Sequence, residues 1–269
     1  MTNALIDTGR GGISFEAFGV TMSVATNRRE ARDRLPEILP PGWRPCPDAD
    51  AKHRLAIVAE DRGTYAVDDA GVYLFESVTL DTALEILERE VRVRIAREAR
   101  DRIFIHAGVV GRAGGALLLP GSSFTGKTTL VAALVRAGAT YYSDEYAALD
   151  DDGLVHPYAK PLSLRVNDHR HRNHHVESLG GTAGDRPLPV RAIVVTNYRR
   201  AAKWAPNPLS TGDGALALLA HTIPARERPA ECLRATRRAA EDAIVVKGDR
   251  GEAEDVVPLL LAELEARAA

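Results

Sequence analysis

Residues 121–128 read Gly-Ser-Ser-Phe-Thr-Gly-Lys-Thr and fit the pattern G-x-x-x-x-G-K-[ST] at every position. Glycines allow a tight turn whose N–H groups point at a phosphate, and the helix that follows adds its positive end. Lys127 would reach the β- and γ-phosphates, and the Thr128 hydroxyl would bind Mg²⁺. An apolar run at 116–119 precedes the loop and a helix is expected at 127–136, which is the order that the motif requires. The sequence therefore predicts a nucleoside triphosphate site formed by Gly121, Ser122, Ser123, Phe124, Thr125, Gly126, Lys127, Thr128 and Thr129.

The acidic pair Asp144-Glu145 follows a short strand-like run at 140–143. If this run neighbours the strand before the glycine loop, both carboxylates lie at the edge where open α/β sheets bind ligands. One carboxylate would hold Mg²⁺, and the other would accept a proton from an attacking hydroxyl. The alternative is a solvated turn. The four residues before the pair are too polar for the acidic motif of a motor ATPase, which argues against that class.

These residues, with their surroundings IHAGVVGRAGGALLLPGSSFTGKTTLVAALVRAGATYYSDEYAALD, resemble the catalytic core of HPr kinase/phosphorylase. The stretch is more similar still to HPr-kinase-related proteins, some of which phosphorylate serine in lasso-peptide precursors. The resemblance covers about residues 103–165 and weakens through 190–222. It implies a nucleotide domain with a mixed sheet of the PEP carboxykinase type. It also places His106 on the family's histidine upstream of the loop, Asp144 and Glu145 on its acidic pair, and Arg165 on a later arginine.

The resemblance implies a kinase that uses ATP and Mg²⁺ to phosphorylate a hydroxyl, most simply a serine of a protein or peptide. Its catalytic residues would be Lys127, Asp144, His106 and Arg165, and its metal ligands Thr128, Asp144 and Glu145. A small-molecule hydroxyl is the alternative acceptor. A catalytically inactive, nucleotide-gated binding module is the alternative class, favoured by Phe124 where the family usually has glycine. The stretch after Leu164 lacks the family signature, which leaves HPr as acceptor, and the reverse phosphorylase activity, open.

A polar segment at 167–175 contains four of the eight histidines of the chain, interleaved with arginines. Two hypotheses follow from this composition. A cationic, mobile lid would close over phosphates or steer an acidic acceptor. A metal site would need the histidines to converge, although their spacing matches no known ligand pattern.

The elements that must position these residues form a mixed α/β chain with a boundary near residue 100. Residues 1–100 are predicted to be a smaller α+β region of unknown role, and residues 101–269 the catalytic domain. Strands are expected at 13–25, 55–59, 65–75, 103–110, 116–119, 140–143, 146–149, 154–158, 161–166, 190–198 and 243–247. Helices are expected at 80–99, 127–136, 213–222, 229–241 and 254–267, and loops at 34–47 and 167–188.

Composition bears on whether the protein binds nucleic acid, spans a membrane or is secreted. The chain has 269 residues, 45% hydrophobic and 27% charged, with a formal net charge of −2, so bulk charge does not predict nucleic-acid binding. Its apolar runs fall short of the roughly 20 residues of a membrane span, and no secretory signal is visible, so a cytoplasmic location is predicted. The two cysteines are isolated in sequence. A homo-oligomer is compatible with the family resemblance.

Overall fold

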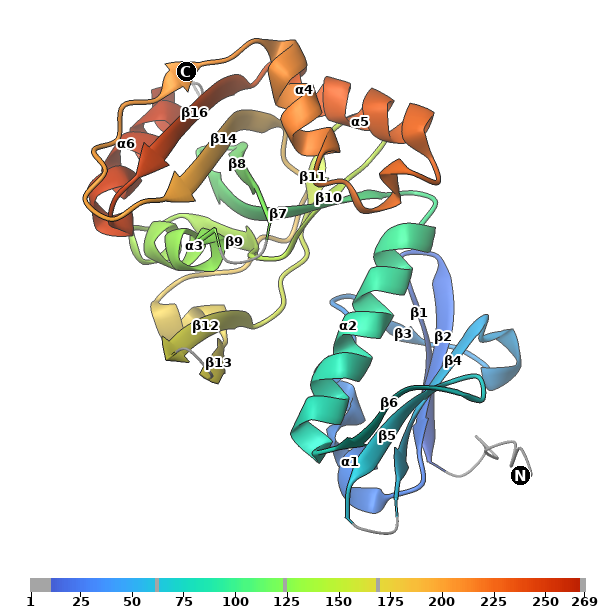
Figure 1. The fold of residues 1–269 in the computed structure, drawn as a ribbon. Coiled ribbons are helices and arrows are strands. Elements are labelled where there is room, and N and C mark those ends of the chain that lie inside the picture. The colour runs from blue at the N-terminus through green and yellow to red at the C-terminus, as the bar shows by residue number, and fades with distance from the viewer. Residues whose placement is uncertain (1–10, 61–62, 123–124, 168–169, 267–269) are drawn as a thin grey trace. The chain divides into compact units, whose positions relative to one another are not determined.

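The computed structural model describes residues 11–60, 63–122, 125–167 and 170–266. The chain divides into two compact units, Met1–Arg100 and Asp101–Ala269, each with its own sheet and helices (Figure 1). The division falls where the sequence changes from the amphipathic helical pattern at 80–99 to apolar runs bounded by glycines.

The first unit is built on a six-stranded sheet in the order β3-β1-β2-β4-β5-β6. Neighbouring strands are antiparallel, except that β2 and β4 are parallel. Two hairpins turn through Phe18-Gly19 and Ala70-Gly71, and all four of these residues have positive φ. Turns of this kind match the right-handed twist of the strands that they join, so both hairpins are specified locally. The strands are β1 (Gly12–Ala17), β2 (Val20–Thr26), β3 (Arg44–Pro45), β4 (His53–Ala59), β5 (Tyr65–Asp69) and β6 (Val72–Val78).

One long helix, α2 (Leu80–Glu98), packs on this sheet against β4 and β5. It begins where the Thr79 side chain accepts a hydrogen bond from the Thr82 N–H, which satisfies a donor that the first turn leaves unpaired. Apolar residues recur at helical spacing, so one face of the helix is buried. This buried face includes Leu84, Leu87, Val91 and Ile95. The unit also contains α1 (Arg29–Arg34), η2 (Leu35–Ile38) and η3 (Asp48–Asp50).

The second unit is built on a mixed sheet in the order β11-β10-β7-β8-β14-β16-β15, with β9 also paired to β7. Strands β8, β14 and β16 are parallel to one another, whereas β7 is antiparallel to β8, β9 and β10. The predicted mixed α/β class is therefore confirmed. The strands are β7 (Ile103–Arg112), β8 (Gly115–Pro120), β9 (Thr140–Ser143), β10 (Tyr146–Leu149), β11 (Val155–His156), β14 (Val190–Tyr198), β15 (Asn207–Pro208) and β16 (Ile244–Arg250).

Helices cover both faces of this sheet (Figure 1). Helices α3 and α6 share one core with Leu117 and Leu119 of β8, and α4 and α5 share the other with Ala116 and Leu118. Successive strand residues point to opposite faces, so β8 is fixed from both sides. The helices are α3 (Lys127–Arg136), α4 (Thr211–Leu219), α5 (Pro229–Glu241) and α6 (Ala253–Ala266), with η5 (Ile223–Ala225) between α4 and α5.

The segment 167–188 is not the loop that the sequence predicts. Strand β13 (Arg170–His174) pairs with β12 (Leu162–Asn167) in an antiparallel two-stranded sheet, and η4 (Val176–Leu179) follows. The polar side chains of this segment give no apolar alternation. The neighbouring strand nevertheless offers its backbone a hydrogen-bonding partner, and strand formation depends on such context more than on local preference.

Elsewhere the observed ends of strands and loops differ from the predicted ones by smaller amounts. The predicted loop at 34–47 contains η2 and β3, and the strand predicted at 154–158 is reduced to β11. The strand predicted at 243–247 continues to Arg250, because Gly248 and Asp249 remain paired with Thr196 and Asn197 of β14. Within the described ranges, no helix combines the length and the apolar character needed to cross a bilayer.

An aromatic cluster formed by Phe104 of β7, Tyr146 of β10 and Tyr158 provides a test of this core. Phe104 is 0% exposed and makes edge-to-face contacts with two tyrosines. Its ring centroid lies 5.6 Å from that of Tyr146 and 5.8 Å from that of Tyr158. We expect Phe104→Ala to lower the free energy of unfolding by about 3–5 kcal/mol, because the ring leaves a cavity that the neighbours fill only partly. Leu216→Ala on α4, at a side chain that is 58% exposed, should stay within about 0.5 kcal/mol of the parent. Urea denaturation measures both, and equal effects would contradict a central role for the cluster.

Candidate functional site

The glycine loop joins the end of β8 to the start of α3, as the motif requires. Gly126 precedes the helix in a left-handed conformation, with φ of 83°, and its carbonyl accepts the first helical hydrogen bond from Leu130 at 3.1 Å. A Cβ at this position would lie 2.6 Å from the guanidinium of Arg250. Both the backbone conformation and the close neighbour therefore require glycine here.

Lys127 is the first residue of α3, and its ammonium group lies over the loop. It donates hydrogen bonds to the carbonyl oxygens of Gly121 at 2.8 Å and Ser122 at 2.7 Å. Burial lowers the pKa of the Lys127 ammonium group, and the charges of Glu145 and Asp144 oppose this shift. The lysine lines the same cavity as the acidic pair, and its flexible stem would let the ammonium group turn toward a phosphate.

The acidic pair lies in the tight turn between β9 and β10. The buried Ser143 hydroxyl accepts hydrogen bonds from the N–H groups of Glu145 at 3.0 Å and Tyr146 at 2.8 Å. Strand β9 pairs with β7 and not with β8, but Ser143 aligns with Val109, which aligns with Leu118. The turn thus ends at the same edge of the sheet as the glycine loop.

Asp144 is buried, with 4% of its surface exposed. The Tyr141 hydroxyl lies 2.9 Å from Asp144 Oδ1 and 2.9 Å from the Lys160 carbonyl oxygen, and can donate its proton to either acceptor. Burial, together with the charge of Asp144, raises the pKa of Tyr141 far above its ordinary value. The tyrosine therefore remains a neutral donor that orients the carboxylate.

His106 on β7 connects the loop to the acidic pair. Its Nε2 lies 3.6 Å from Glu145 Oε1, and its carbonyl oxygen accepts a hydrogen bond from the Gly121 N–H at 3.3 Å. The N–H of the next residue, Ala107, donates to the Glu145 carbonyl at 3.1 Å. The structure thus brings together three features that the sequence separates by up to 39 positions, at 106, 121–128 and 144–145.

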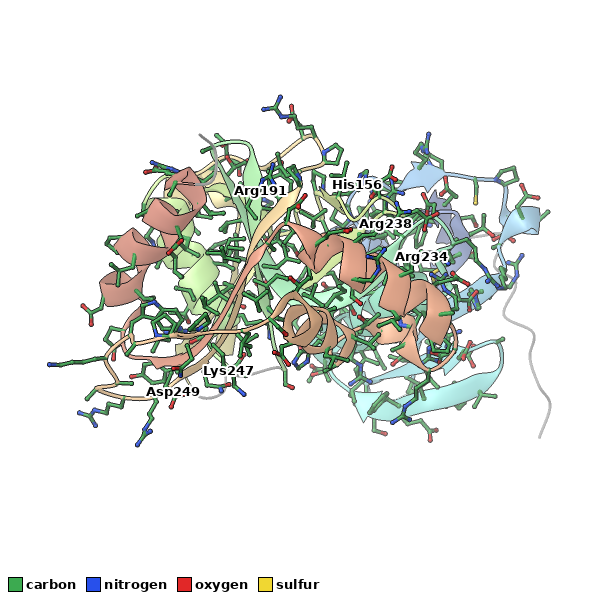
Figure 2. All side chains as sticks on the ribbon, turned by 90° about the horizontal axis from the view of Figure 1, so that it is seen from above. His156, Arg191, Arg234, Arg238, Lys247 and Asp249 are labelled. Atoms are coloured by element: carbon green, nitrogen blue, oxygen red, sulfur yellow. The ribbon has the colours of Figure 1, made fainter. Side chains whose placement is uncertain are left out.

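Arg250 is a candidate residue that the sequence analysis missed. It is the last residue of β16 and is 2% exposed; Lys247 and Asp249 of the same strand are labelled in Figure 2. Its Nη2 donates to the Gly126 carbonyl at 2.8 Å and its Nη1 to the Gly251 carbonyl at 3.0 Å, while Nε has no hydrogen-bond partner in the described part of the chain. Among the described residues, no carboxylate lies within ion-pair distance of this guanidinium. A buried cation in this state is suited to bind an anion.

His221 is a second residue that the sequence did not single out. It follows α4, and its carbonyl accepts the His106 N–H at 2.8 Å, so it fixes the backbone of that histidine. Burial lowers the pKa of the His221 imidazole, and the charge of Lys127 lowers it further. Neither Arg250 nor His221 belongs to a sequence motif, and only the sheet order brings them to the loop. An arginine-glycine pair between a strand and a helix is the one local signal for Arg250.

A cavity of about 600 Å³ opens over the start of α3. It contains both the basic groups of the loop and the acidic pair. Its lining residues all belong to the second unit: His106, Gly126, Lys127, Thr128, Thr129, Asp144, Glu145, Ser163, Tyr198, Arg250, Glu252, Ala253 and Glu254. The volume is in the range of small-molecule sites, and the lining combines phosphate-binding and acid–base groups.

The oxygen-containing side chains that line the cavity are of the kind that binds Mg²⁺. The Thr128 hydroxyl and the carboxylates of Asp144 and Glu145 are oxygen ligands that line one cavity. Magnesium is commonly held by one or two carboxylates together with substrate phosphates and water, rather than by a closed protein cage. The described part of the chain contains no group of three or more histidine, cysteine, aspartate or glutamate residues placed to hold a metal.

Three predictions fall wholly or partly outside the described residues. Ser123 and Phe124 of the loop are not described. Arg165 lies on β12, opposite His171 of β13, but the side chains of 165–172 lie outside the description, so neither its catalytic role nor the lid or metal hypothesis for 167–175 is tested. Gly121, Ser122 and Thr125 lie in the loop beside the cavity, and the Thr125 hydroxyl donates to the Ser122 carbonyl at 3.0 Å.

Comparison with models of known protein families and with curated proteins finds no match for this chain. The HPr-kinase-like assignment therefore stays a prediction from the residues themselves.

The contact between Tyr141 and Asp144 can be tested by removing one hydroxyl. We expect Tyr141→Phe to lower the free energy of unfolding by about 1.5–3 kcal/mol, because a buried carboxylate loses its hydrogen-bond donor. Tyr142→Phe is the matched control. Its hydroxyl donates to the Arg186 carbonyl at 2.8 Å, and its loss should cost about 0.5–1.5 kcal/mol. Urea denaturation at neutral pH measures both, and a larger loss for Tyr142→Phe would contradict this account of Asp144.

The lowered pKa of His221 predicts a pH dependence of stability. As pH falls below 6.5, the ordinary pKa of a histidine, the unfolded chain binds a proton on this imidazole more readily than the native protein does. The native state therefore loses stability in that window, and His221→Gln removes this loss. Urea denaturation at pH 7.5 and 5.5 should show that the stability of the variant relative to the parent rises at the lower pH. A relative stability that stays constant or falls would contradict the burial of a neutral imidazole.

Proposed function

We propose that this protein is an ATP-dependent kinase of the HPr-kinase-like type that transfers the γ-phosphate to a hydroxyl group, most simply a serine of a protein or peptide. The observation that carries the proposal is that the Lys127 loop and the Asp144-Glu145 turn line one cavity. A phosphate-binding loop alone does not decide the fate of the γ-phosphate. Acidic groups facing it give a hydroxyl nucleophile a place to bind and a base to accept its proton.

The basic groups would bind the polyphosphate. The N–H groups at the start of α3 and the positive end of the helix favour an anion there. Lys127 would leave the carbonyls that it now contacts and bind the β- and γ-phosphates. Arg250 would pair its buried charge with a phosphate oxygen while it holds the Gly126 carbonyl. Two cations fixed before the reaction lower its barrier, because no solvent must reorganise around the developing charge.

The acidic groups would act on the acceptor. Asp144, oriented by Tyr141, would accept the proton of the attacking hydroxyl. At the same time the hydroxyl oxygen would form a bond to the γ-phosphorus, and the bond from this phosphorus to the leaving ADP oxygen would break. Thr128 and Glu145 would hold Mg²⁺, which neutralises charge on the phosphates when it is bound. His106 would keep Glu145 in place through the 3.6 Å contact between their side chains. The mixed sheet and the position of His106 beside the loop support the HPr-kinase-like type.

Lys127 gives the direct test of this chemistry. We expect Lys127→Ala to reduce phosphoryl transfer at least about 100-fold, because a preorganised cation at the transferring group is lost. The fold should be unchanged, since the hydrogen bonds of this side chain to described residues go only to two loop carbonyls. Lys203→Ala, at an exposed lysine of the same unit, is the matched control. Transfer by Lys127→Ala at the rate of the control would refute the kinase assignment.

The acceptor is found with γ-labelled ATP, Mg²⁺ and a size-fractionated extract of the source organism, with Lys127→Ala as the inactive control. Label that enters macromolecules only with the active protein supports a protein or peptide kinase, and mass spectrometry then locates the serine. Label in the small-molecule fraction would replace this acceptor with a metabolite hydroxyl. Bound ATP with label in neither fraction would favour a nucleotide-gated binding module.

A further inference from the structure

The cavity has two chemically different ends, set by the strand order. On one side of β8, strand β7 and the turn after β9 bring His106, Asp144 and Glu145 to the edge of the sheet. On the other side, β14 and β16 run parallel to β8 and end in register, with Tyr198 opposite Arg250. The kinase chemistry proposed above uses the first end. The second end has no role in it beyond Arg250.

Tyr198 at this second end is a half-exposed aromatic residue held by several contacts. The residue is 46% exposed, its hydroxyl donates to Glu252 Oε1 at 2.8 Å, and the Arg250 guanidinium lies over the ring, 5.7 Å from its centroid. A Cβ on Gly126 would lie 3.5 Å from Tyr198 Cβ, so the side chain begins directly beside the phosphate loop. An exposed pair between Arg199 and Asp249, at 3.5 Å, joins the ends of the same two strands (Asp249 is labelled in Figure 2).

Charge distinguishes what each end can bind. The charges that act on the Lys127 ammonium group are those of Glu145 and Asp144, so the lysine and the acceptor machinery share the first end. The second end is lined by Glu252 and Glu254. Glu252 is bonded to Tyr198, and the pair presents an aromatic ring with a carboxylate behind it. Beyond Arg250 these two carboxylates disfavour a polyphosphate chain, whereas an aromatic base has the Tyr198 ring to stack on and its polar substituents have an acceptor nearby.

We propose that Tyr198 forms the nucleoside subsite of this cavity, with the base of the nucleotide stacked on its ring and Glu252 holding the ring in place. The inference rests on the proposed function and assigns the direction of the nucleotide. The γ-phosphate points to Asp144, and the nucleoside lies over the ends of β14 and β16. Tyr198 is thus a residue that distinguishes a nucleoside triphosphate from a bare polyphosphate.

The test compares two ligands that share the phosphate chain. Isothermal titration calorimetry of the full-length protein measures the affinities for Mg²⁺–ATP and Mg²⁺–tripolyphosphate. We expect Tyr198→Ala to weaken ATP at least about fivefold, the low end of what one stacked base contributes, and to leave tripolyphosphate unchanged. Tyr198→Phe keeps the ring and should retain most of the affinity for ATP. Tyr73→Ala, at a tyrosine that is 54% exposed in the first unit, is the matched control and should change neither affinity.

Two results would overturn the nucleoside subsite while the proposed function stands. Tyr198→Ala could leave ATP affinity unchanged, so that the base binds elsewhere. It could also weaken ATP and tripolyphosphate equally, so that the tyrosine acts on the loop through Arg250 and not on the base. A parent protein that binds neither ligand would instead refute the proposed function, and this inference with it. Thermal unfolding of each variant verifies that the fold is retained.

Discussion

The hydrogen bond from Arg250 to the Gly126 carbonyl determines how the cavity is assembled. It joins the last strand of the sheet to the turn that starts α3, and it needs a glycine, because φ is 83° there and a Cβ would meet the guanidinium at 2.6 Å. The bond exists only if β8, β14 and β16 end at the same edge. Parallel pairing of these three strands thus fixes both the shape of the loop and the cation behind it. The helices on both faces hold that pairing by filling two separate cores.

Charges of both signs meet in this cavity, and neutral dipoles hold three of them. Lys127 and Arg250 are bonded to backbone carbonyls, and Asp144 accepts a hydrogen bond from the neutral Tyr141 hydroxyl. Burying charges without direct ion pairs costs stability, and such arrangements concentrate at functional sites. Carbonyl and hydroxyl partners carry no net charge, so the charges of Lys127, Arg250 and Asp144 can still act on a ligand. A direct ion pair between Lys127 and Asp144 would instead neutralise both before any ligand bound.

The two units contribute unequally. The first unit has its own six-stranded sheet and a long amphipathic helix, and every described residue that lines the cavity belongs to the second unit. The residues to which the proposed chemistry is assigned therefore all lie within 101–269. Within that unit, the antiparallel β7 brings the acid–base groups to one side of β8, and the parallel β14 and β16 bring Arg250 and Tyr198 to the other. Mixed strand direction thus gives one cavity two ends of different chemistry.

The sequence by itself determined the loop and the elements around it, because these depend on local patterns. Glycine spacing, the apolar run of β8 and the helical period of α3 are all read within about 20 neighbouring residues, and the pair Asp144-Glu145 follows a short strand that was also predicted. Tertiary structure alone decided the rest. Arg250 became part of the site because pairing with β14 carried β16 through Gly248 and Asp249, past the predicted strand end at residue 247. Residues 170–174 became a strand because β12 paired with them. Hydrogen bonds between distant strands overrode local preference in both places, and no local pattern records such bonds.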